Sequence, residues 1–212
     1  MAEPLSPRFS RKVLLVCAAV VVGAGVGVAL AATRTSSAPT KRTQLQLHGQ
    51  AVWSSGQKPA SDFSLRDQAG RTVSLSSQRG HVVLLAFLDS RCHSACPLDG
   101  AQLGRVARVL RGRPLDLVVV SVDPWADTPA SARAFARHAR WASGWQWLLG
   151  SKRTLKPIWR AYAIAVIRTP HDVVHTRTAY LIDPKGYVRA AYLFPLEPAG
   201  VVRDARSLLR AA

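Results

Sequence analysis

Two uninterrupted apolar runs, joined by an amphipathic stretch, constrain the fold of this chain more than any other feature. Residues 81–88 (HVVLLAFL) and 115–122 (LDLVVVSV) each predict a strand that is covered on both faces. The stretch between them places apolar side chains on one face of a helix, opposite several arginines: Leu98, Leu103, Val106, Ala107 and Leu110. Two buried strands joined by one helix predict a parallel β-α-β unit.

Elements on both sides of this unit predict a mixed α/β domain. A turn at residues 67–70 separates two short strand signals, 63–65 and 72–75, which predicts a hairpin before the unit. Two helices, a second hairpin and a final helix follow the unit, at residues 129–140, 152–162, 178–182, 187–192 and 198–210. This order predicts a thioredoxin-like α/β fold with an N-terminal β-hairpin over residues 59–212.

The N-terminal part of the chain predicts a membrane anchor. Residues 13–32 carry no charge and are long enough for a transmembrane helix of about 30 Å. Basic residues in the tail 1–12 favour a cytoplasmic N-terminus, and the polar linker 33–58 then holds the domain off the membrane. The alternative is a signal peptide cleaved at the site 29–31 (ALA). Both interpretations place the rest of the chain on the extracytoplasmic face.

The basic excess does not by itself predict binding to nucleic acid. The chain has 29 Lys and Arg against 12 Asp and Glu, a formal net charge of +17. In residues 59–212 the basic residues are mostly arginines that stand singly, without zinc-finger spacing or an RNA-binding signature. We therefore expect no nucleic-acid partner, and we note attraction to anionic membrane lipid as an effect that this charge allows.

Two of the three cysteines stand four residues apart, directly behind the first apolar strand. At this spacing Cys92 and Cys96 can point to one spot, within disulfide range of each other. A helix N-terminus and the neighbouring Arg91 favour the thiolate form. The pair predicts a soft metal site or a redox couple, with an inert disulfide as the structural alternative. Cys17 is expected to pack as a small apolar residue in the N-terminal run.

His175 supplies a third candidate group. It lies in the loop before the predicted strand 178–182, where thioredoxin-like oxidoreductases carry a cis-proline facing their cysteines. No proline lies between Pro170 and Pro184 in this chain. Two thiolates and one imidazole form a donor set suited to Cu(I), Cu(II) or zinc. His171, four residues earlier, is expected to be an ordinary loop residue.

From about residue 59 to 212 the chain resembles the Sco/SenC family, membrane-anchored, thioredoxin-like copper proteins of cytochrome c oxidase assembly. The resemblance rests on Cys-x3-Cys-Pro at 92–97, Ser-Val-Asp-Pro-x-x-Asp-Thr-Pro at 121–129 and His-x4-Tyr-Leu-Ile-Asp-Pro-x-Gly at 175–186. The segment PASDFSL at 59–65 and the strand GHVVLL at 80–85 complete it. The resemblance implies that Cys92, Cys96 and His175 are copper ligands.

The chain departs from the family pattern beside this site. The family usually reads Cys-Pro-Asp-x-Cys-Pro, whereas this chain has His93 and Ser94 in place of the Pro-Asp pair. Val174 replaces the acidic residue usual before the histidine. These changes remove negative charge, so that affinity, redox potential or even the metal could differ. We expect His93 to be an exposed turn residue, with an auxiliary ligand as the alternative.

Two further segments are expected to be structural. Residues 121–129 predict a strand end, a turn set by proline and a helix cap, rather than an acidic binding loop. Trp141, Trp145 and Trp147 are expected to join the core, with an exposed docking patch as the alternative.

These residues allow two functions and argue against a third. The first is a metallochaperone, which binds and transfers copper without turnover, to the copper-bearing subunit of cytochrome c oxidase or to another copper chaperone. The second is a dedicated thiol–disulfide reductase, in which Cys92 attacks and Cys96 resolves. The third, a peroxidase of the peroxiredoxin type, lacks the necessary hydroxyl because position 89 is Asp89. We expect the copper role, with the reductase as the alternative.

Overall fold

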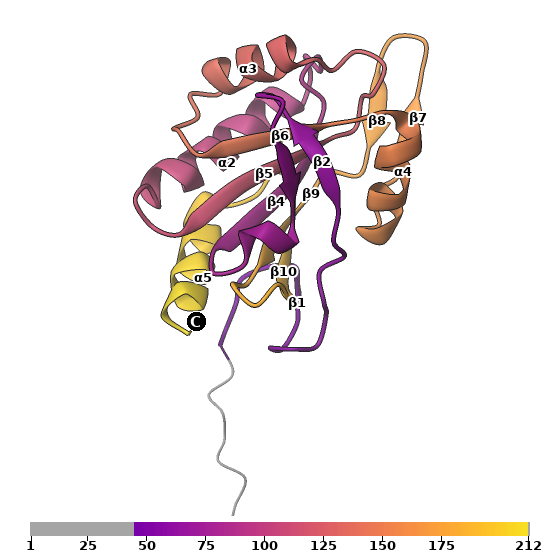
Figure 1. The fold of residues 1–212 in the computed structure, drawn as a ribbon. Helices are drawn as coiled ribbons and strands as arrows, with labels where there is room; N and C mark the ends of the chain where they lie inside the picture. Colours follow the sequence, from indigo (N-terminus) through magenta and orange to yellow (C-terminus); the bar gives the residue numbers. More distant parts are fainter. Residues whose placement is uncertain (1–44, 212) are drawn as a thin grey trace, which may run out of the picture. The chain divides into compact units, whose positions relative to one another are not determined.

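The computed structural model describes residues 45–211, which carry an eight-stranded mixed sheet with helices on both of its faces (Figure 1). Its strands are β1 (Ala51–Val52), β2 (Ser64–Asp67), β3 (Thr72–Ser74), β4 (Val82–Leu88), β5 (Leu115–Ser121), β6 (Trp145–Leu149), β9 (Thr178–Ile182) and β10 (Val188–Leu193). A separate two-stranded hairpin consists of β7 (Val166–Arg168) and β8 (Val173–His175). The helices are the short 3-10 helix η1 (Ser76–Gln78) and the α-helices α2 (Cys96–Val109), α3 (Pro129–His138), α4 (Lys152–Ala161) and α5 (Pro198–Arg210).

The predicted tail 1–12 and membrane span 13–32 lie outside the described residues. Within residues 45–211, no helix is both long enough and apolar enough to cross a membrane. Contacts divide the chain into two units, residues 1–43 and 44–212, and the second unit contains the whole sheet.

The strand order of the large sheet is β1-β10-β9-β4-β5-β6-β2-β3. Strand β4 pairs in parallel with β5, and β5 in parallel with β6, whereas the other neighbours are antiparallel. The predicted parallel β-α-β unit and both predicted hairpins are therefore present. Strand β6 was not predicted, because its tryptophans were expected only to form an aromatic cluster in the core.

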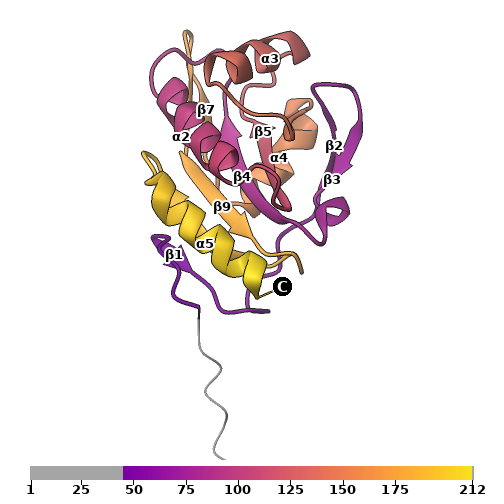
Figure 2. The same cartoon turned by 90° about the vertical axis from the view of Figure 1, so that its left-hand side faces the viewer.

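Strand β4 divides the interior into two cores because its side chains alternate between the faces of the sheet. All seven of its residues are buried. Val82, Leu84, Ala86 and Leu88 pack in a core that also receives apolar residues of α2, α3 and α5. The intervening residues of β4 pack in a second core with residues of α4 and of the β2–β3 hairpin. Figure 2 shows α2, α3 and α5 together on the face of the sheet that carries the first of these cores.

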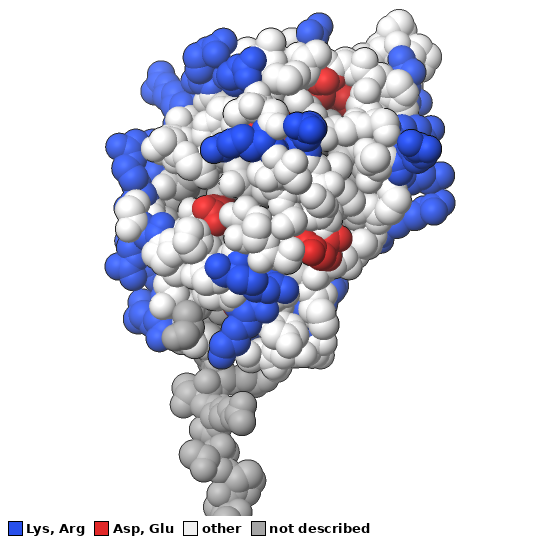
Figure 3. Space-filling model, viewed as in Figure 1, with Lys and Arg blue, Asp and Glu red and all other residues white. Residues whose placement is uncertain are grey.

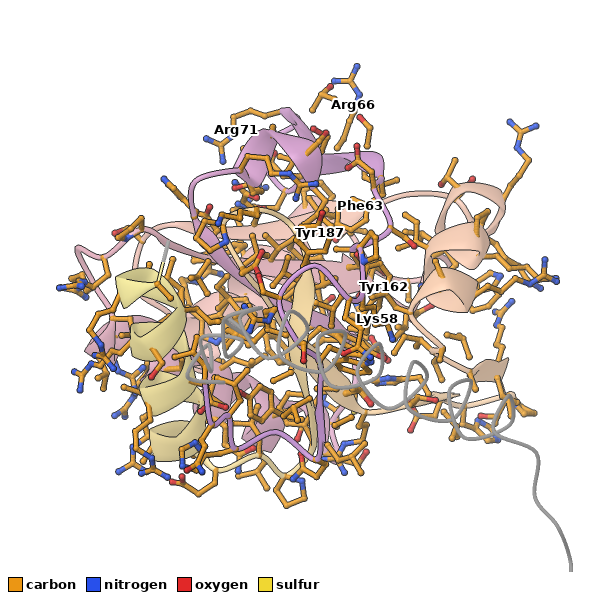
Figure 4. All side chains as sticks on the ribbon, turned by 90° about the horizontal axis from the view of Figure 1, so that it is seen from below. Lys58, Phe63, Arg66, Arg71, Tyr162 and Tyr187 are labelled. Carbon is orange, nitrogen blue, oxygen red and sulfur yellow. The ribbon has the colours of Figure 1, made fainter. Side chains whose placement is uncertain are left out.

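Aromatic rings anchor the β2–β3 hairpin over the second core. Phe63 and Tyr162, both labelled in Figure 4, are buried, with ring centroids 6.5 Å apart. The Tyr162 hydroxyl donates to the carbonyl oxygen of Ser61 at 2.8 Å. Arg66, by contrast, projects outward from β2 (Figure 4). One face of this hairpin is therefore covered and the other is exposed, as its alternating pattern requires.

The predicted linker 33–58 ends earlier than expected. Strand β1 pairs antiparallel with β10, and Leu45 and Leu47 pack against the first core. Residues 45–58 therefore belong to the folded domain. Local sequence could not indicate this because their partners lie more than a hundred residues later in the chain.

The aromatic cluster and the first turn of α2 test two finer expectations. Trp147 is fully buried and stacks on Trp141, with ring centroids 5.9 Å apart. Trp141 in turn contacts Trp145 edge to face at 5.7 Å, so the cluster joins the core as predicted. The expectation that Leu98 faces the core is wrong, because this side chain is 54% exposed in the first turn of α2.

Candidate metal centre

The cysteine pair lies where the chain passes from β4 into α2. Cys96 is the first residue of α2 and is 1% exposed. Cys92 lies in the irregular segment before the helix and is half-buried. Both are free thiols. The two residues are therefore not on one helix, and the pair instead spans the helix start.

Hydrogen bonds to Asp127 hold the start of the segment that carries Cys92. The Asp127 carboxylate accepts a hydrogen bond from the backbone N–H of Ser90 at 2.9 Å and from the Ser121 hydroxyl at 2.6 Å. The next residue, Thr128, caps α3 in a reciprocal capping box with Ser131. Residues 121–129 therefore position the cysteine segment and start a helix, which agrees with their expected structural role.

His175 contacts the buried cysteine. Its Nε2 atom lies 3.8 Å from the Sγ atom of Cys96. Its Nδ1 atom lies 3.0 Å from the carbonyl oxygen of Thr176, which can only accept, so Nδ1 carries the proton and Nε2 presents a lone pair. Burial lowers the pKa of this imidazole, which keeps it neutral. The sequence placed His175 in a loop, whereas it is the last residue of β8.

An ion pair joins the two elements that carry His175 and Cys96. Arg177 donates through Nε at 2.8 Å and through a terminal nitrogen at 2.5 Å to the two carboxylate oxygens of Asp99. Asp99 is fully buried in the first turn of α2, and Arg177 lies two residues beyond His175. This two-pronged contact holds the histidine segment against the helix start. Neither residue was predicted to belong to the site, because the contact joins segments that are distant in the sequence.

The two thiols differ in acidity. A hydrogen bond from Cys96 lowers the pKa of the Cys92 thiol to about 4, and the Ser94 hydroxyl, 3.4 Å from the Cys92 sulfur, adds to the effect. Donation to Cys92, together with burial, raises the pKa of Cys96 well above its ordinary value. Cys92 is therefore the thiolate of the metal-free reduced pair, and Cys96 holds the proton.

A buried carboxyl group, that of Asp89, lies between the end of β4 and Cys92. Asp89 is 2% exposed, and burial raises its pKa to about 7. Its Oδ1 atom accepts from the backbone N–H of Arg91 at 2.7 Å, which shapes the turn before Cys92. No role was predicted for Asp89 beyond the absence of a peroxidase hydroxyl at this position. Its position immediately after a fully buried strand was the signal that could have identified it.

Two hollows flank the cysteine segment. One, of about 430 Å³, lies between α2 and α3 and is lined by Cys92, His93 and His138 among others. The other, of about 330 Å³, is polar and is lined by His93, His171 and Asp89 among others. His93 and His171 are both exposed, as expected. The half-buried sulfur of Cys92 is therefore accessible from the groove between the two helices.

The donor chemistry fits a soft or borderline metal ion. Cys96 contacts the unprotonated nitrogen of His175, and Cys92 lies four residues before Cys96, which begins α2. Among residues 45–211, no three His, Cys, Asp or Glu side chains already surround a common point. Binding therefore requires these donors to draw together. Two thiolates and a neutral imidazole suit copper or zinc and do not suit magnesium or calcium.

Comparison with known proteins places this geometry among related chains. The SCO1 protein homolog of Bacillus subtilis (strain 168) is 28% identical over 137 residues, which cover 61% of this chain and 71% of that protein. The crystal structure of Arabidopsis thaliana ScoI with copper bound is similar with a TM-score of 0.65 at 22% identity, covering 72% of this chain and 99% of that one.

BsSco, described with a disulfide switch as a member of the Sco family of cytochrome c oxidase assembly proteins, is similar with a TM-score of 0.64. It is 23% identical, and the match covers 79% of this chain and 99% of BsSco. In both cases the match spans almost the whole of the solved chain. The SCO1/SenC family model matches residues 53–210, most of the sequence, and the chain therefore belongs to the SCO1/SenC family.

Proposed function

We propose that this chain binds copper through Cys92, Cys96 and His175 and delivers it to the copper-bearing subunit of cytochrome c oxidase. The observation that carries the proposal is the contact of the buried Cys96 sulfur with the unprotonated nitrogen of His175, beside the thiolate of Cys92. Thiolates favour Cu(I), and the imidazole lets the same residues hold Cu(II). The family and the copper-bound state of Arabidopsis ScoI support this choice of metal.

Each residue has a distinct task in this function. Cys92 offers an ionised sulfur at the surface, so it is the donor that an incoming ligand of the partner can displace first. Cys96 and His175 remain behind it on elements that the Asp99–Arg177 pair joins. Copper is the cargo, and it leaves by ligand exchange rather than by turnover. The predicted span 13–32 would hold the domain at the extracytoplasmic face of the membrane.

A titration with Cu(I) tests the proposal. Residues 33–212, reduced and free of metal, compete with a chelator for Cu(I), beside Cys92→Ser, Cys96→Ser and His175→Ala. We expect one copper per chain, and a loss of about 100-fold or more in affinity for each cysteine variant. His175→Ala should alter the Cu(II) spectrum.

His171→Ala is the matched control, because His171 is an exposed histidine four residues from His175. It should bind like the unaltered protein. Cysteine variants that bind copper as tightly as the unaltered protein would refute the copper site.

A second function, reduction of a partner's disulfide, is favoured by one specific observation. The Cys92 thiolate is half-buried and accepts a hydrogen bond from Cys96, the arrangement of an attacking and a resolving thiol. Cys92 would attack the partner's disulfide, and Cys96 would then close the Cys92–Cys96 disulfide and release both partner cysteines reduced. The disulfide switch described for BsSco supports redox chemistry in this family. The reduction potential of the pair, measured against glutathione, separates this function from copper binding.

A further inference from the structure

The outer face of α2 and α5 carries many more basic residues than acidic ones. Seven arginines are exposed on these helices and on the turn after α2: Arg105, Arg108, Arg111, Arg113, Arg203, Arg206 and Arg210. None of them forms an ion pair within residues 45–211. The acidic residues inside the two helices, Asp99 and Asp204, are fully buried. This surface, the α2–α5 face, therefore carries an excess of positive charge, which one exposed carboxylate, Glu197, offsets only in part through its attraction to Arg203 and Arg105.

The figures show how this charge is distributed. In Figure 3, Lys and Arg gather along the edge of the molecule formed by α2 and α5, and a second basic region lies over α4 at the opposite edge. Figure 4 shows side chains that end in nitrogen projecting outward from α5. Blue groups also lie over α3 and across the middle of this view, so charge alone does not distinguish the α2–α5 face.

A groove distinguishes the α2–α5 face. It has a volume of about 420 Å³ and is lined by Arg105, Arg203 and Arg206. Its one acidic lining residue, Glu197, already caps α5 by accepting from the backbone N–H groups of Ala199 and Gly200. Val109, 53% exposed, adds an aliphatic side chain to the same groove. Guanidinium groups around a shallow hollow fit phosphate oxygens.

The chain also enters the domain beside α5. Leu45, the first described residue, packs against the core that α5 covers. The backbone N–H of His48 donates to Asp204 of α5 at 2.6 Å. The predicted span ends at residue 32, and residues 33–44 can reach at most about 40 Å when fully extended. A membrane segment ending there would therefore lie within about 40 Å of the point, beside α5, where the chain enters the domain.

We propose that the α2–α5 face docks on an anionic lipid bilayer, with headgroup phosphates bound around Arg105, Arg203 and Arg206. An acidic protein surface would offer the same charge, but the proximity of the N-terminal segment to α5 favours the membrane. Cys96 begins α2, about 13 Å along the helix from Arg105, so the docked domain leaves the metal centre free for a partner. The predicted anchor is the reason for choosing a membrane as the partner, and the docking itself does not involve copper.

Sedimentation with vesicles tests the proposal on metal-free residues 44–212, which contain both cores. Vesicles consist of phosphatidylcholine alone or with about 30% phosphatidylglycerol, at about 0.05 M and 0.5 M salt. We expect binding only to the anionic vesicles at low salt. Replacing Arg105, Arg203 and Arg206 by Ser should weaken this binding by at least about tenfold.

The matched control removes the same charge from the other basic edge. Arg153, Lys156 and Arg160 are exposed on α4, and their replacement by Ser should change vesicle binding by less than about twofold. Circular dichroism of both triple variants confirms the fold. Equal losses in the two triple variants would mean that overall charge alone binds the vesicles, which overturns the proposal. Absence of binding to anionic vesicles, with binding to polyglutamate, would reassign the face to an acidic protein.

Discussion

At the scale of single residues, the two thiols of the site are expected to differ in reactivity. The pKa of Cys92 is lowered to about 4 by the hydrogen bond from Cys96, so Cys92 is a thiolate from weakly acidic to neutral pH. Its alkylation by iodoacetamide should therefore change little between about pH 8 and pH 6, whereas an ordinary thiol slows nearly 100-fold over that range. Mass spectrometry of the reduced, metal-free protein locates the modified cysteine.

Two variants of Cys96 separate the hydrogen bond from the rest of the environment. Cys96→Ala removes the donor, so the pKa of Cys92 should rise and alkylation at about pH 6 should fall by tenfold or more. Cys96→Ser keeps a donor of similar position and should lose less. A rate for Cys92 that drops with pH like that of an ordinary thiol in the unaltered protein would contradict the assigned thiolate.

The residues of the candidate site could be named from sequence, but their contacts could not. The spacing of Cys92 and Cys96 is a local pattern, and it was sufficient to place both at the end of a buried strand. The contact between His175 and Cys96, and the one between Arg177 and Asp99, join segments almost eighty residues apart. Only the packed sheet brings them together, and their role in binding copper stays a prediction.

At the scale of elements, the Asp99–Arg177 pair is expected to couple the start of α2 to the segment between β8 and β9. Arg177→Met leaves the fully buried Asp99 carboxylate unpaired and should cost about 2–4 kcal/mol of unfolding free energy. Asp99→Asn combined with Arg177→Met should lose less than the sum of the single changes. Urea denaturation of the unaltered protein, the two single variants Asp99→Asn and Arg177→Met, and the double variant gives the coupling energy between the two side chains.

A second readout separates positioning from mere stability. If the pair holds His175 against Cys96, Arg177→Met should also alter the Cu(II) spectrum of the loaded protein under conditions where it is fully folded. Arg177→Lys keeps the charge but loses the two-pronged geometry. Its Cu(II) spectrum should therefore lie between those of the unaltered protein and Arg177→Met. Additive losses in urea together with an unchanged spectrum would show that the two elements are held by other contacts.

The elements that sequence predicted are those whose signal is local. Strands β4 and β5 are continuous apolar runs, and α3 begins with a capping threonine and a proline. Strand β6 was not predicted because its Trp-Gln-Trp sequence is equally consistent with an aromatic cluster outside a strand. The hairpin β7–β8 is mostly exposed, so hydrophobic periodicity does not mark it.

At the scale of the whole molecule, Asp204 joins three distant parts of the domain. It is fully buried on α5, and its carboxylate accepts from the Tyr192 hydroxyl of β10 at 2.5 Å and from the backbone N–H of His48 at 2.6 Å. The Nδ1 atom of His48 lies 2.6 Å from the other carboxylate oxygen. Residues 45–58 are therefore expected to unfold together with the domain rather than before it.

Asp204→Ala tests this cooperativity. Loss of the carboxylate leaves buried donors without a partner and should lower the unfolding free energy by about 2–4 kcal/mol in urea. Hydrogen exchange at the backbone amides of β1 should then become faster than in the rest of the sheet, because β1 and the residues around it detach. Arg206→Ser, on the exposed face of the same helix, should change stability by less than about 0.5 kcal/mol. If Asp204→Ala is equally stable and its β1 amides stay equally protected from exchange, the pairing of β1 with β10 holds the N-terminal segment without this contact. The segment that leads toward the predicted membrane anchor would then be secured by backbone hydrogen bonds alone.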